Sequence, residues 1–195
     1  MSRTLPLILL AILAAAGAED KPIAPNLDFE AGAGGGGHPK DWGGGGAGYK
    51  LEADEAIKHG GKVSGRIRFV ESAPDSVFAT LTQCLKPEAL RGKRVRYSGW
   101  MKSEKVEGDT SWAGLWMRVD GKDDKVLSFD NMQDRGVKGT TDWKKYEVVL
   151  DVPTDATGFC FGFLLAGKGT LWGDDLSFEV VDKDKVKTTG APLAL

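Results

Sequence analysis

The feature that most limits the fold of this chain is a succession of short segments in which apolar and polar side chains alternate. Counting an early segment at 26–30, these segments cover residues 26–30, 49–54, 62–70, 76–85, 93–104, 111–121, 125–132, 143–153, 157–167 and 170–181. A period of two is typical of β-strands with one buried face, and no long segment has the 3.6-residue period of a helix. We therefore predict an all-β domain, a jelly-roll β-sandwich of about nine or ten antiparallel strands.

Residues 1–18 have the pattern of a secretory signal peptide. Arg3 precedes an apolar run over 5–16, and a small-x-small sequence ends at Ala18. The apolar run is short for a membrane span. We therefore expect cleavage before Glu19 and a mature protein that is secreted or periplasmic, with no membrane contact after cleavage.

The remaining chain divides into a linker at 19–25, the sandwich domain at 26–182 and a tail at 183–195. The tail is charged and then rich in small residues, so we expect it to be disordered. Glycines crowd the stretch 32–48 and formally match the G-x-G-x-x-G dinucleotide pattern. Proline and further glycines follow where that pattern needs a helix. The stretch instead predicts a flexible surface loop, which Trp42 could fix to the body of the domain.

The two cysteines of the chain, Cys84 and Cys160, leave two interpretations open. An oxidising compartment allows them to form a disulfide. Both lie in predicted strands, so pairing depends on whether those strands are neighbours. Two buried free thiols are the alternative.

Composition and motifs exclude several classes of function. The net charge is −2, and no basic stripe suggests a nucleic-acid partner. The two histidines, His38 and His59, lie in predicted turns, and no histidine pair has metal-ligand spacing. No G-x-S-x-G nucleophile elbow is present. We therefore predict that the protein is not an enzyme.

The segment SWAGLWMRVDG, residues 111–121, contains the most informative pattern. As a strand, it directs Trp112, Trp116 and Arg118 away from the core face, with Gly114 between the two rings. Indoles stack on the C–H faces of sugar rings, and a guanidinium binds hydroxyl groups, so this face suits a ligand platform. The alternative is that the tryptophans are packed beneath the glycine-rich loop, a tail or a partner domain.

Other residues extend this hypothesis. Trp100 lies on the non-core face of its own segment, and Gln83 can hydrogen-bond to a sugar. The polar run 130–135 could do the same, or it could form a loop held by its own side-chain hydrogen bonds. The predicted ligand-binding residues are therefore Trp112, Trp116, Arg118, Trp100 and Gln83. The predicted partner is a carbohydrate or, alternatively, a protein that docks on the same face.

Two carboxylates form a candidate metal site. Asp174 alternates with Trp172, Leu176 and Phe178, so it falls on an expected core face, where an unpaired carboxylate is costly. The first and last strands of a jelly roll often lie side by side, which would bring Glu30 close to Asp174. Carboxylate and carbonyl oxygens suit Ca²⁺. The alternative is an Asp held by hydrogen bonds at a turn.

The segments NLDFE, PKDW, HGGKVSGRI and LWGDDLSFEV resemble the framework of the galactose-binding-like jelly rolls, including carbohydrate-binding modules of families 4, 9 and 22. The middle of the chain, including WAGLWMRVDG and TTDWKKYEVVLDVPTDATGF, is similar to an accessory domain of secreted bacterial peptidases and erythromycin-esterase-type proteins. The resemblance spans nearly all of residues 26–181. It implies a non-catalytic module for carbohydrate or a glycan-like surface, and a structural calcium held by Glu30 and Asp174.

Overall fold

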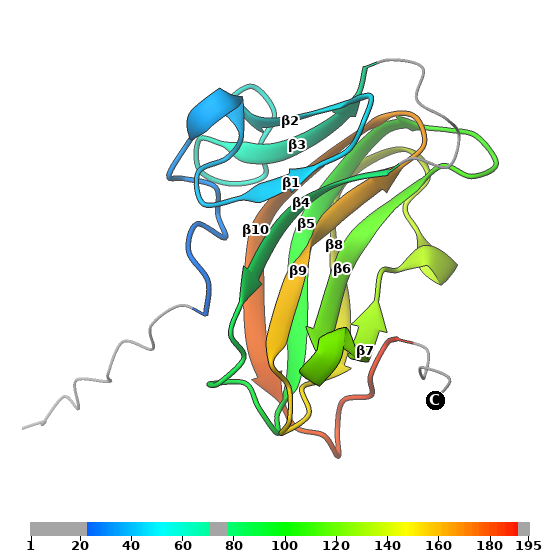
Figure 1. The fold of residues 1–195 in the computed structure, drawn as a ribbon. Helices are drawn as coiled ribbons and strands as arrows, with labels where there is room; N and C mark the ends of the chain where they lie inside the picture. The colour runs from blue at the N-terminus through cyan, green and yellow to red at the C-terminus, as the bar shows by residue number, and fades with distance from the viewer. Residues whose placement is uncertain (1–22, 71–77, 191–195) are drawn as a thin grey trace, which may run out of the picture.

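The computed structural model describes residues 23–70 and 78–190 and shows two β-sheets packed face to face (Figure 1). In the described residues the strands are β1 (Gly43–Gly45), β2 (Tyr49–Asp54), β3 (Ser64–Phe69), β4 (Phe78–Leu85), β5 (Arg94–Val106), β6 (Trp112–Asp120), β7 (Val126–Asp130), β8 (Gly139–Asp151), β9 (Gly158–Ala166) and β10 (Thr170–Val181). Three short 3₁₀ helices are η1 (Gly35–Gly37), η2 (Lys122–Asp124) and η3 (Gln133–Arg135). The predicted antiparallel sandwich of nine or ten strands is confirmed.

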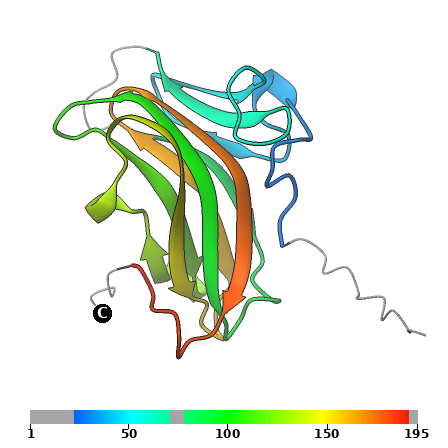
Figure 2. The same cartoon turned by 180° about the vertical axis from the view of Figure 1, so that it is seen from behind.

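Each sheet contains five strands. The order is β1-β4-β9-β6-β7 in one sheet, which we call the front sheet, and β2-β3-β10-β5-β8 in the other, the back sheet. All the pairings are antiparallel. The front sheet faces the viewer in Figure 1, and the back sheet faces the viewer in Figure 2.

The core lies between the sheets and follows the alternation of the sequence. On β6 and β9 the inward side chains are completely buried, namely Ala113, Leu115, Met117, Val119, Phe159, Phe161, Phe163 and Leu165. The back sheet contributes Tyr97, which stacks on Phe178 with ring centroids 4.9 Å apart. Burial of these large aromatic and aliphatic groups is the main stabilising contribution to such a fold. The outward faces of both sheets are therefore free to carry other functions.

The N-terminal region differs from its prediction. Residues 26–30 form a turn rather than a strand, with left-handed backbone at Asn26 (φ 48°) and Phe29 (φ 61°). The glycine-rich stretch is ordered, because Gly43–Gly45 form β1 and pair with β4. Glycine is required at Gly44, where a Cβ would lie 1.8 Å from a backbone oxygen of β4. Trp42 is buried and stacks on Phe29 at 5.1 Å, so it fixes this region to the core.

The predicted signal peptide and residues 19–22 of the predicted linker lie outside the described residues, as do residues 191–195. The tail was expected to be disordered from residue 183, but residues 183–190 follow the sandwich closely, and Thr189 pairs with the backbone of β8. Within the described ranges, no helix has the length and hydropathy needed to cross a membrane.

Candidate functional site

A groove of about 800 Å³ lies on the outer face of the front sheet. Strands β4, β9, β6 and β7, the loop before β6 and the turn after β7 supply its lining. The lining residues are Phe78, Thr80, Thr82, Cys84, Thr110, Trp112, Trp116, Arg118, Phe129, Asn131, Gln133, Cys160, Leu164 and Ala166. Its floor is mostly aromatic and aliphatic, with amides and hydroxyls among the apolar groups. This composition is typical of pockets for organic ligands.

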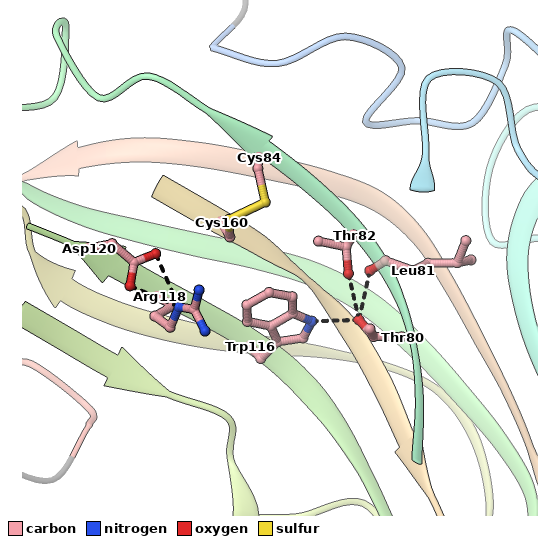
Figure 3. The surroundings of a disulfide bond; sticks show 8 residues. All are labelled: Thr80, Leu81, Thr82, Cys84, Trp116, Arg118, Asp120 and Cys160. Carbon is pink, nitrogen blue, oxygen red and sulfur yellow. Dashed lines mark hydrogen bonds and ion pairs between the residues drawn. A yellow bond between two sulfur atoms is a disulfide. The ribbon is translucent and has the colours of Figure 1, made fainter. Parts of the chain in front are cut away.

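Both tryptophans predicted for the ligand platform lie in this groove and are partly exposed. The indole Nε1 of Trp116 donates a hydrogen bond to the hydroxyl of Thr80 at 2.8 Å, and Thr80 in turn lies 2.8 Å from the hydroxyl of Thr82 (Figure 3). This series of hydrogen bonds fixes the orientation of the indole before any ligand binds. Trp116 pairs in register with Gly162 of β9, which has no side chain to cover the ring.

Arg118, the third predicted platform residue, also lines the groove. Its side chain is 45% exposed, and its Nε lies 3.0 Å from the carboxylate of Asp120 (Figure 3). The guanidinium is therefore oriented by a neighbour two residues along the same strand. Because the Asp120 charge offsets the Arg118 charge, the groove offers hydrogen-bond donors without a large positive field.

The cysteines form a disulfide in the lining of the groove. Cys84 of β4 and Cys160 of β9 are directly opposite in the ladder, with Cα atoms 4.1 Å apart. Of the two interpretations that the sequence left open, the structure has the disulfide. It joins strands on the outer face, next to Trp116 and Arg118 (Figure 3).

Two of the predicted contacts lie elsewhere. Gln83 is buried on the face of β4 opposite to Thr82 and Cys84, and its amide donates to the carbonyl of Pro25 at 2.9 Å. Trp100 belongs to β5 in the back sheet, where its ring stacks on His59 with centroids 4.0 Å apart. Grouping these two side chains with Trp112 and Trp116 is therefore corrected.

Two strand glycines beside the tryptophans, Gly114 and Gly162, are approached closely by other parts of the chain. A Cβ at Gly114 would lie 2.9 Å from the side chain of Met132, and one at Gly162 would lie 1.9 Å from the carbonyl oxygen of Leu81. These positions need glycine because neighbouring strands and turns approach closely. The open surface of the groove is formed by larger side chains.

Sequence reasoning missed several lining residues that simple alternation could have found. In the segment 76–85, alternation places Phe78, Thr80, Thr82 and Cys84 on one face and Gln83 on the other. Gln83 was predicted to contact a ligand because its side chain is polar. Its place in the alternation instead puts it on the inner face of β4. Phe129 on β7 could be found in the same way only after β7 was known to be the neighbour of β6.

Asp174 is completely buried, but not in the sandwich core. A bulge between Asp174 and Ser177 shifts the register of β10, and Asp175 in it has φ 46°. Before the bulge the odd-numbered residues of β10, such as Leu171, face the core, and after it the even-numbered residues, such as Leu176, do so. Asp174 therefore points outward, beneath a loop. The prediction that Asp174 shares a face with Leu176 is corrected by this bulge.

The two predicted metal ligands bind backbone N–H groups of one loop, residues 59–63. Asp174 accepts from His59 at 2.8 Å and Gly60 at 3.1 Å, and Glu30 accepts from Lys62 at 2.6 Å and Val63 at 3.1 Å. Burial raises the pKa of the Asp174 carboxyl, whereas these backbone hydrogen bonds lower the pKa of the Glu30 carboxyl.

This arrangement matches the alternative of a hydrogen-bonded Asp at a turn. In the part of the chain that the structure describes, no three His, Cys, Asp or Glu side chains gather around a possible metal position. The donor set around Glu30 and Asp174 therefore does not by itself fit a metal ion. Calcium binding at this place stays a prediction, which melting curves with Ca²⁺ and with EDTA would check.

No protein-family model matches the chain. A xylan-binding CBM22 domain of Paenibacillus barcinonensis Xyn10C superposes with a TM-score of 0.55 at 14% identity, over 80% of this chain and 92% of that one. A CBM61 module in complex with β-1,4-galactotriose superposes with a TM-score of 0.52 at 16% identity, over 83% and 99%. The chain has the jelly-roll fold of these carbohydrate-binding modules.

The chain also has a relative among curated proteins. An uncharacterized HTH-type transcriptional regulator of Bacillus subtilis, YbfP, is 39% identical over 140 residues. That match covers 72% of this chain and 46% of the regulator, so the chain spans about half the length of the relative.

The expected resemblance in fold to the carbohydrate-binding jelly rolls is confirmed by the solved structures.

Proposed function

We propose that this jelly-roll domain is a secreted, non-catalytic module that binds a neutral carbohydrate in the groove of the front sheet. The observation that carries the proposal is the pair of partly exposed indoles, Trp112 and Trp116, in one open groove. The fold comparisons add weight, since one matched module is named for xylan binding and another was solved with a galactotriose.

The lining suits a neutral glycan better than an anionic one. Indole rings offer flat surfaces to the C–H faces of pyranose rings. Arg118, Asn131 and Gln133 supply donors and acceptors at the rim for hydroxyl groups. Because Arg118 is paired with Asp120, no unpaired cation of the described lining is offered to a carboxylate or sulfate.

The same lining argues for binding rather than hydrolysis. Glycoside hydrolysis typically uses two carboxyl groups, one as acid and one as base or nucleophile. The described residues that line the groove include neither a carboxylate nor a histidine. None of these lining side chains is therefore a carboxylic acid or imidazole that could protonate a leaving group.

Isothermal titration calorimetry tests the proposal with soluble xylo-, cello- and β-1,4-galacto-oligosaccharides. We expect Trp116→Ala to lower the affinity for the best of these at least tenfold, about 1.4 kcal/mol. Trp143→Ala is the matched control, because Trp143 is also partly exposed but lies on β8 of the back sheet. A folded wild-type protein that binds no neutral glycan would contradict the proposal.

A protein partner on the same face is the second candidate. Phe78, at one end of the groove, is 56% exposed, which extends the apolar surface beyond the two indoles. Exposed apolar patches of this kind often mark protein interfaces. A glycan array separates the candidates, because a protein-docking face gives no glycan signal in either the wild type or Trp116→Ala.

Export is part of the proposal as well. The signal-like pattern at 1–18 and the disulfide Cys84–Cys160 both suit an oxidising compartment outside the cytoplasm. Expression of the full chain in a bacterium should give an exported protein whose mass corresponds to a start at Glu19. Retention of an uncleaved protein in the cytoplasm would contradict this part.

A further inference from the structure

Strand β7 is weakly held by its own sheet. It has five residues and pairs with β6 through four of them, with a shift in the register. The turn that follows it carries Asn131 and Gln133, which line the groove. A bridge between Val137 and Ala113 of β6 holds the far end of this turn. The position of its near end therefore depends also on what holds the side of β7 that faces away from β6.

A buried carboxylate, Asp130, organises the turn. Its Oδ1 accepts from the backbone N–H of Met132 at 2.8 Å, and both oxygens accept from the guanidinium of Arg135, at 3.1 and 2.5 Å. The hydroxyl of Thr189 donates to Oδ2 at 2.6 Å. Charge-assisted hydrogen bonds of this number fix the orientation of a carboxylate and of the backbone that it binds.

Thr189 belongs to the C-terminal segment, which returns along the edge of the sandwich that β7 and β8 form (Figures 1 and 2). Arg94 of β5 anchors the segment by donating to the carbonyls of Lys183 and Val186 at 3.1 and 2.5 Å. Further on, the N–H of Thr189 donates to the carbonyl of Val149 on β8, and the N–H of Val149 donates to the Thr189 hydroxyl. That hydroxyl therefore accepts from the back sheet and donates to Asp130 of the front sheet.

Gly190 shows how closely the segment approaches the groove wall. A Cβ there would lie 2.5 Å from the carbonyl oxygen of Phe129 and 3.1 Å from a methyl group of Leu150. Phe129 also lines the groove with its side chain. The segment thus lies directly behind the strand that forms this wall.

We propose that residues 182–190 are a clasp that positions the polar rim of the groove, with Thr189 as the positioning residue. The clasp joins the edges of the two sheets and, through Asp130, holds the turn that presents Asn131 and Gln133. Its consequence for ligand affinity rests on the proposed function, whereas its effect on the turn does not.

Hydrogen–deuterium exchange of the intact chain tests the positioning directly. Thr189→Val removes the hydroxyl with little change in shape, and we expect exchange at the amides of Met132 and Arg135 to become at least tenfold faster. Thr189→Ser keeps the hydroxyl and should restore slow exchange. Thr188→Val is the matched control, because Thr188 is exposed and makes none of these contacts. Unchanged exchange in Thr189→Val would overturn the clasp.

Calorimetry with xylohexaose as the probe tests the consequence for binding. We expect Thr189→Val to lower affinity at least threefold, with Thr189→Ser and Thr188→Val close to the wild type. Faster exchange with unchanged affinity would overturn the link between the clasp and the ligand. A wild-type protein that binds none of the glycan probes contradicts the proposed function, and the exchange measurement still decides whether the clasp holds the turn.

Discussion

Two tryptophans on the outer faces of the two sheets, Trp116 and Trp172, differ in how far they are covered. On the front sheet, Trp112 and Trp116 remain partly exposed in a groove. On the back sheet, Trp172 is buried, and its indole donates to the carboxylate of Asp54 at 2.8 Å. Trp116 therefore contributes to an open surface, whereas Trp172 makes a covered contact.

The difference follows from the neighbouring strands. Trp172 pairs in register with Arg66 on one side and Lys102 on the other, so long cationic side chains flank its ring. Trp116 is flanked by Gly162, and its indole donates to a small hydroxyl residue, Thr80. Trp116 therefore stays open beside small neighbours, whereas long cationic side chains flank and cover Trp172.

The two sheets also differ in what holds their strands together, because the front sheet contains the disulfide. Its removal is expected to change the free energy of unfolding more than any other substitution considered. Cys84 and Cys160 close a loop with a sequence separation of 76. Loss of this constraint should lower the free energy of unfolding by about 4 kcal/mol on the chain-entropy account. Urea denaturation of Cys84→Ser/Cys160→Ser against the oxidised wild type measures it. A loss below about 1 kcal/mol would mean that the front sheet is held without its covalent link.

On the back sheet we expect the largest electrostatic effect at Asp54. This buried carboxylate binds Arg66 at 2.6 Å and the indole of Trp172, so Asp54→Asn removes one of the two carboxylates that pair with a partly buried guanidinium, the other being Glu52 at 2.8 Å. The expected loss is about 2 kcal/mol, as for charge-assisted hydrogen bonds. Asp142→Asn is the matched control, because Asp142 is 87% exposed in its pair with Lys102, and such pairs contribute about 0–1 kcal/mol. Equal losses in the two variants would contradict the contrast.

The dependence of stability on pH adds a second measurement at the same residue. Burial alone would raise the pKa of Asp54, but hydrogen bonds from Trp172 and Ala56 and the charge of Arg66 outweigh it, so the pKa is lowered. The stabilisation is therefore present above the unfolded pKa of about 3.9 and is lost as the pH falls through the lower folded value. Below about pH 4, the melting temperature of Asp54→Asn should fall less steeply than that of the wild type.

Most of the fold could be predicted because alternation reports directly on burial in an antiparallel sandwich. Ala113, Leu115 and Met117 are completely buried, as their phase in the strand indicates. Prediction was wrong where backbone geometry interrupts the period. The bulge after Asp174 and the left-handed turn at Phe29 each reverse or end the alternation, and no side-chain pattern marks them.

The site could be predicted in part for a related reason. Trp116 and Arg118 share one strand, so a single phase places them together. Whether Trp100 joins them depends on which sheet its strand enters, and alternation within one strand contains no information about that. The clasp was missed because the tail around Thr189 has a charged composition typical of disorder, although its role depends on one hydroxyl between two strands.

The smallest effect on stability, and a sharp test of the contrast, is expected at Arg118. Arg118→Gln breaks an exposed pair with Asp120, so the free energy of unfolding should change by no more than about 0.5 kcal/mol. The matched change on the back sheet, Arg66→Gln, leaves the buried Asp54 unpaired and should cost several times more. Urea denaturation measures both losses, and calorimetry with xylohexaose should show weaker binding only for Arg118→Gln. The reverse result would mean that Arg118 holds the fold rather than a ligand, because a side chain presented to a ligand contributes little to stability while no ligand is bound.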